Sequence, residues 1–112
     1  MAAKVDFPEL FDHLKDEISS LAKVSLKKYA DEAKNDGLLL LTSMKEKLAR
    51  WTVALANGDL TTEDFEWLVN SQKELVEMEA LKQAGLGAIR VDQFKNSVLN
   101  MVVDTVFSFI KI

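Results

Sequence analysis

The sequence is poor in the residues that make covalent cross-links and frequent turns. It contains no cysteine, one proline and four glycines in 112 residues. The absence of cysteine excludes a disulfide framework, a thiolate zinc site and a thiol nucleophile. It also suits a reducing compartment, and we expect the protein to be cytoplasmic. So few proline and glycine residues favour a small number of long helices over many short strands.

Patterns typical of catalytic, metal and cofactor sites are also missing. His13 is the only histidine, and the sequence offers it no partners at the spacing of a zinc site or a catalytic triad. Gly85 and Gly87 are not followed by the Lys-Ser/Thr pair of a phosphate-binding loop. We therefore predict no catalytic residue, no metal site, no cofactor and no enzyme activity.

A segment around Gly58 has some likeness to the second half of a calcium-binding EF-hand loop. Aligning Gly58 with the glycine of that loop puts Val53 and Leu55 at its first and third ligand positions. Neither side chain supplies the oxygen that calcium needs. We interpret the segment as a turn followed by a helix cap, because Thr61 and Asp64 have capping-box spacing.

Positive charge is scarce in the second half of the chain. The net charge is −4; residues 1–56 carry nine basic and nine acidic side chains, whereas residues 57–112 carry five and nine. Nucleic-acid binding needs clustered lysine and arginine, so we predict no nucleic-acid partner. No run approaches the ~20 apolar residues that span a bilayer, and the first residues lack the apolar core of a signal peptide. The sequence thus disfavours a membrane partner.

Apolar residues are plentiful and recur with helical periodicity. They make up 48% of the chain, and the length suits one domain, since domains commonly have about 100–150 residues. We predict a single all-α domain over residues 1–112, a four-helix bundle of mostly antiparallel helices joined by short connections. Gly37 is expected to end the first helix, with one long curved helix through Gly37 as the alternative. The expected helices cover residues 8–35, 38–56, 62–84 and 90–111.

Two apolar patterns distinguish the second and third expected helices. On the third, Trp67, Met78 and Leu81 lie off the main stripe and form a second, smaller one. Exposed groups of apolar side chains commonly mark an interface, where tryptophan and methionine are enriched. The second helix carries a 3-4-3-4 seam typical of core positions. Its residues are Leu41, Met44, Leu48, Trp51 and Leu55.

The fourth expected helix is apolar over about two-thirds of its circumference, although a bundle helix needs an arc of only a little over 100°. The β-branched residues of 98–110 raise a strand as an alternative, but the spacing of the polar residues fits a helix better. We predict that the surplus apolar surface contacts another subunit. The polar strip consists of Gln93, Asn96, Ser97, Asn100, Asp104, Ser108 and Lys111. The predicted interface residues are Trp67, Met78, Leu81, Leu99, Val103, Val106, Phe107 and Ile110.

These patterns favour a non-enzymatic structural or interaction protein that works as a homo-oligomer. The alternative is a small acidic inhibitor or immunity-type protein that binds a basic surface of another protein. A third possibility, membrane-surface association through the last helix, lacks the basic flank that such helices use. Candidate contacts for the alternative are the acidic residues Asp59, Glu63, Asp64, Glu66, Glu74 and Glu77.

Overall fold

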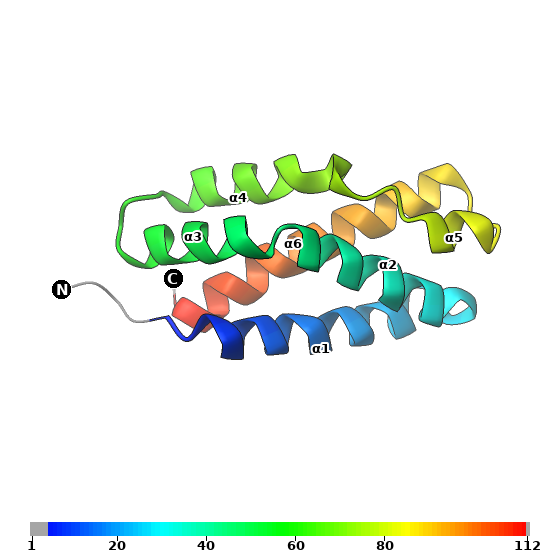
Figure 1. Ribbon diagram of the computed structural model, residues 1–112, viewed down its shortest axis with the longest axis horizontal. Coiled ribbons are helices and arrows are strands. Elements are labelled where there is room, and N and C mark those ends of the chain that lie inside the picture. Colours follow the sequence, from blue (N-terminus) through cyan, green and yellow to red (C-terminus); the bar gives the residue numbers. More distant parts are fainter. Residues whose placement is uncertain (1–4, 112) are drawn as a thin grey trace.

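The computed structural model describes residues 5–111 and confirms the all-α class. It contains six α-helices and two short 3-10 segments, with no strand among the described residues (Figure 1). The predicted strand alternative for 98–110 is therefore wrong. In chain order the elements are α1 (Phe7–Ser25), η1 (Lys27–Tyr29), α2 (Ala30–Ser43), α3 (Lys45–Ala56), α4 (Thr62–Asn70), η2 (Ser71–Leu75), α5 (Glu79–Gln83) and α6 (Ala88–Ile110).

The helices lie along the long axis of an elongated molecule of about 50 × 22 × 19 Å. α1 runs away from the end where the described chain begins, and α2 and α3 return to it (Figure 1). α4, η2 and α5 run outward again, and α6 returns behind them, so that α1 begins and α6 ends at the same end of the molecule. Buried residues from all six α-helices belong to one hydrophobic core.

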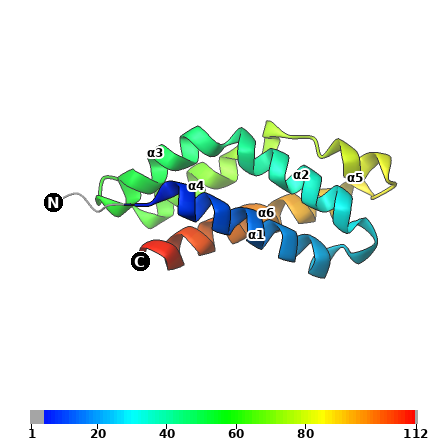
Figure 2. The ribbon, with the colours of Figure 1, turned by 60° about the horizontal axis from the view of Figure 1, so that its bottom comes forward.

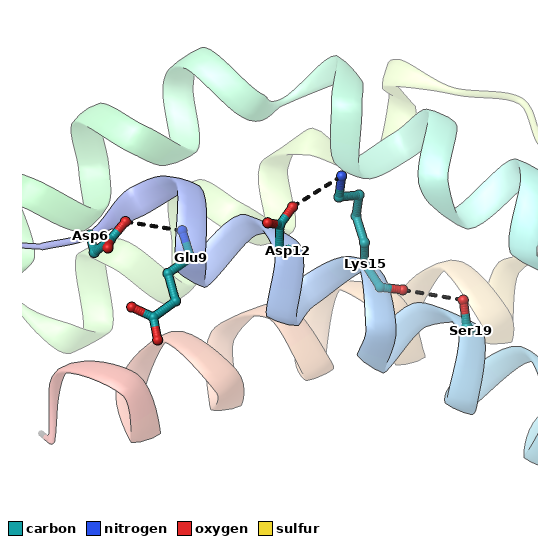
Figure 3. A network of polar contacts seen from close by, with 5 residues as sticks. All are labelled: Asp6, Glu9, Asp12, Lys15 and Ser19. Carbon is teal, nitrogen blue, oxygen red and sulfur yellow. Dashed lines mark hydrogen bonds and ion pairs between the residues drawn. The ribbon is translucent and has the colours of Figure 1, made fainter.

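α1 begins at a side-chain cap and buries one stripe of apolar residues. The Asp6 carboxylate accepts a 3.1 Å hydrogen bond from the Glu9 N–H, which satisfies one free donor of the first turn (Figure 3). On the exposed side, Asp12 pairs with Lys15 at 3.2 Å, and the Ser19 hydroxyl donates to the Lys15 carbonyl. The buried stripe comprises Leu10, Phe11, Leu14, Ile18 and Ala22.

Gly37 does not end a helix, so the prediction of a break there is wrong. It lies inside α2, where a Cβ would come 2.8 Å from the Cγ2 of Ile18 in α1. The glycine thus serves close helix packing instead of a turn. The chain leaves α1 earlier, at Leu26, whose non-helical backbone (φ −137°, ψ 67°) leads into η1. The expected helix over 8–35 is therefore two helices.

The expected helix over 38–56 is also interrupted, at Met44, where the backbone (φ −104°, ψ 7°) departs from helical geometry between α2 and α3. The predicted core seam nevertheless survives the break. Met44 is fully buried, and Trp51 is half-buried and packs against the core. The other buried members are Leu41, Leu48 and Leu55.

The expected helix over 62–84 begins as predicted and then breaks. The Thr61 hydroxyl accepts a 3.0 Å hydrogen bond from the Asp64 N–H, which confirms the cap. After η2, however, Val76 is extended, and Met78 adopts a left-handed backbone at φ 57°. That conformation costs a non-glycine residue roughly 1–2 kcal/mol. Met78 is fully buried, and the burial of such a side chain offsets this cost.

The break is secured by Asp36, a buried carboxylate of α2. Its two oxygens accept hydrogen bonds from the N–H groups of Ala80 (3.3 Å) and Leu81 (2.8 Å). These are first-turn donors of α5, which have no acceptor inside that helix. The positive end of the α5 dipole also favours the negative charge of Asp36. One short helix is therefore capped from a distant part of the sequence.

α6 is a central helix, bounded by α1, α4, η2 and α5 (Figure 2). Its apolar side chains from Val91 to Val106 are buried against these neighbours, except that Met101 is half-buried. The predicted polar strip faces solvent, except that Ser97 is half-buried. The chain itself thus covers the surplus apolar surface. Among residues 5–111, no helix is long and apolar enough to cross a membrane.

Candidate functional site

Trp67 is the one predicted interface residue that the structure leaves exposed. Its side chain is 70% accessible. Five of the other predicted interface residues are buried within the single chain, where neighbouring helices cover them, so they are not exposed on its surface to a second subunit. These buried residues are Met78, Leu81, Leu99, Val103 and Val106.

Phe107 and Ile110, the remaining predicted interface residues, are half-buried and pack against the core. The Phe107 ring lies 5.7 Å from that of Phe65, centroid to centroid, in a tilted arrangement. Such a pair stabilises the packing of α6 on α4. Both residues therefore contribute first to the fold of the single chain.

The periodicity of α4 explains the exposure of Trp67. Phe65 and Val69, four residues apart, are buried and define the inner face of this nine-residue helix. Trp67 lies two residues from each, so a rotation of about 200° places it on the opposite side. A tryptophan directed into water on the outer face of a helix does not contribute to the core.

The surroundings of Trp67 are acidic. Glu63 and Asp64 lie one turn before it on α4, Glu66 is its neighbour in sequence, and Glu74 follows in η2. All four are exposed. We call this surface, formed by Glu63, Asp64, Glu66, Trp67 and Glu74, the acidic face. It combines a large apolar side chain with a rim of negative charge.

The carboxylates of the acidic face form no ion pair with any residue of the range 5–111. Of the other predicted contacts, Asp59 is exposed in the turn before α4, and Glu77 is exposed beyond η2. Glu77 pairs with Lys82 at 2.9 Å. The hydrogen bond and charge of Lys82 lower the pKa of Glu77, and the Glu77 carboxylate in turn raises the pKa of Lys82. Glu77 is therefore partnered, unlike the acidic face.

His13 lies on the exposed side of α1, as its position in the sequence predicts. Its Nε2 is 3.8 Å from a Glu17 carboxylate oxygen, and both residues line a shallow hollow with Asp104 and Ser108 of α6. Within the described part of the chain, no group of three His, Cys, Asp or Glu residues is arranged to hold a metal ion.

The sequence pattern could not separate Trp67 from Met78 and Leu81, because it treats residues 62–84 as one helix. The chain breaks after η2, so Met78 and Leu81 belong to the start of α5 and are buried in the core. The exposure of Trp67 could have been predicted from the acidic residues that surround it in the sequence, because such a group of charges is typical of a solvated helix face. Comparison with known proteins adds no relative: no protein family, no curated protein and no solved structure matches this chain significantly.

Proposed function

We propose that this chain is a non-enzymatic interaction protein with the fold of a helical bundle. Its acidic face binds a basic surface of another protein. The observation that carries the proposal is the 70% exposure of Trp67 amid four carboxylates without an ion-pair partner in residues 5–111. Tryptophan is enriched among the residues that dominate binding energy at protein interfaces. The surrounding charge selects a partner with lysine or arginine at the matching positions.

Charge also decides between this partner and a second copy of the chain. A two-fold symmetric contact centred on Trp67 would bring the carboxylates of the acidic face against their own copies. Such like-charge contacts cost several kcal/mol in an interface. Homo-oligomerisation is therefore the second candidate function. Light scattering after size exclusion distinguishes the two, because the first proposal expects a monomer in the absence of the partner.

The proposal is tested by capture of proteins from an extract of the source cells, followed by titration of the purified partner. Trp67→Ala removes the apolar centre of the acidic face, and Glu66→Lys with Glu74→Lys reverses part of its rim. The matched control is Asp16→Lys with Asp104→Lys, which makes the same change in net charge at exposed positions of α1 and α6, outside the acidic face.

We expect one partner whose capture is lost with both acidic-face variants and kept with the control. Its affinity in purified form should fall as salt rises, because exposed charges at the rim are screened. Equal loss in the control would mean that net charge alone drives capture. Equal capture by Trp67→Ala and the unmodified protein would contradict a binding site at this face.

A further inference from the structure

Two adjoining hollows lie at the far end of the molecule, where α1 passes into η1 and α6 begins (Figure 1). Their volumes are about 160 and 300 Å³, and Ser25, Leu26 and Arg90 line both. The smaller hollow extends along α6 past Gln93 to Ser97, and the larger one extends along η1. We call this concavity the basic cleft, formed by Ser25, Lys27, Lys28, Arg90 and Gln93.

The floor of the basic cleft is apolar and well packed. Leu26 is 5% exposed and Phe94 is 3% exposed, and both belong to the hydrophobic core. The polar rim residues therefore stand on a packed junction between α1 and α6, which contact each other directly. Side chains supported in this way can hold a ligand in one place better than those of a mobile loop.

The rim carries three positive charges and no negative one. Lys27, Lys28 and Arg90 are exposed and form no ion pair within residues 5–111. Asp31 and Glu32 follow in the first turn of α2, yet neither lines the hollows or pairs with the lysines. In a chain with a net charge of −4, these three cations form a local positive potential.

Two neutral hydrogen-bond donors stand beside these cations. The Ser25 hydroxyl and the Gln93 side-chain amide have no hydrogen-bond partner in the described range. Arginine presents a planar fork that matches phosphate oxygens, and lysine adds compact charge. Donors spread over three elements suit a tetrahedral dianion better than a planar carboxylate. We propose that the basic cleft binds the phosphate group of a phosphate monoester, independently of the acidic face.

The source of that phosphate is either a soluble ester or a lipid headgroup. Val24, which lines the larger hollow, is 77% exposed, and Ile89, next to Arg90, is 76% exposed. Exposed aliphatic side chains beside basic ones are the combination that enters a membrane interface. These two residues therefore provide a way to separate the sources by mutation, because neither supplies a donor to the phosphate.

The first test is a titration of the whole chain with inorganic phosphate, in which the amide ¹H–¹⁵N spectrum is recorded at each phosphate concentration. We expect saturable shifts at Ser25, Lys28 and Arg90, with affinity lowered about tenfold or more by Arg90→Gln. The matched control, Arg50→Gln, removes an exposed arginine of α3 outside the cleft and should leave the affinity unchanged. Absence of saturable shifts, or an equal effect of both variants, would overturn the proposal.

The second test measures sedimentation with phosphatidylcholine vesicles, with and without phosphatidic acid, which carries a phosphate monoester. Retention only by the phosphatidic acid vesicles, lost in Arg90→Gln and weakened by Val24→Ser with Ile89→Ser, identifies a lipid headgroup. Phosphate shifts without vesicle retention exclude a lipid headgroup and leave a soluble phosphate compound as the source. Vesicle retention that Arg90→Gln leaves intact, together with no response to inorganic phosphate, would overturn the proposal.

Discussion

The carboxylate of Asp36 accepts a 2.8 Å hydrogen bond from the backbone N–H of Leu81, which lies 45 residues further along the chain. Asp36 is 1% exposed, and its other oxygen accepts from Ala80. A buried carboxylate is stable only when it is well partnered. Here the partners are the free donors of a helix that has only five residues, so the interaction fixes the position of α5.

We expect Asp36→Ala to lower the free energy of unfolding by about 1–3 kcal/mol, because two N–H groups of α5 lose their acceptor. Asp36→Asn keeps one acceptor oxygen and should cost less. Denaturant unfolding measures both. The control is Asp16→Ala, at an exposed position of α1, which should change stability by less than about 0.5 kcal/mol. An equal loss in the control would show that Asp36 has no special role.

Gly37→Ala should have opposite effects in two backgrounds. In the unmodified chain, the new methyl would meet Ile18, and overpacking costs about 1–3 kcal/mol. In an Ile18→Ala background the space is free, and alanine should stabilise α2 by about 1 kcal/mol relative to glycine. Thermal or denaturant unfolding of the four proteins measures the coupling. The same effect of Gly37→Ala in both backgrounds would contradict the close contact.

Trp67→Ala and Met78→Ala should differ sharply, although the sequence places both residues on one predicted stripe. Trp67 is 70% exposed, and its loss should change the free energy of unfolding by less than about 0.5 kcal/mol. Met78 is fully buried, and its loss should cost about 2–5 kcal/mol. Denaturant unfolding checks the pair. A large loss for Trp67→Ala would place that side chain in the core.

Val103→Lys combined with Phe107→Lys should unfold the chain, not merely separate subunits. Val103 is 4% exposed, and Phe107 packs on Phe65. Lysine at position 103 would bury a charge without a partner, which proteins tolerate poorly, and lysine at position 107 would remove the ring contact with Phe65. Circular dichroism should show a weaker helical signal and no cooperative unfolding transition on heating. A double variant that stays folded with a reduced mass in light scattering would restore the interface predicted for α6.

The parts of the fold that the sequence predicts are those governed by local pattern. The cap of Thr61, the start of α1 beside Pro8 and the polar strip of α6 each depend on spacing within one helix. The breaks at Leu26 and Met44 carry no glycine or proline. The helical periodicity of the sequence continues through both positions, so it gives no sign of either break.

Gly37 and Met78 also show that residue type alone does not predict where a helix breaks. Glycine usually signals a stop, but at position 37 it permits the close approach of Ile18. Methionine usually favours a helix, but at position 78 it takes the left-handed conformation next to a capped helix start. For the site, the acids around Trp67 were recognisable in the sequence. The basic cleft was not, because its cations come from segments that only the fold brings together.

Because the molecule is elongated, we expect binding at one proposed site to leave the affinity of the other unchanged. The acidic face extends from the first turn of α4, near one end of the 50 Å axis, along α4 into η2. The segments that line the basic cleft, the end of α1, η1 and the start of α6, lie at the other end (Figure 1). Ligands at the two sites would not collide, and exposed charges that far apart are screened at physiological salt. Without a shared conformational change, their binding free energies should simply add. Under the two proposals, the chain would then bind a basic protein and a phosphate-bearing molecule at the same time, each with the affinity that it has alone.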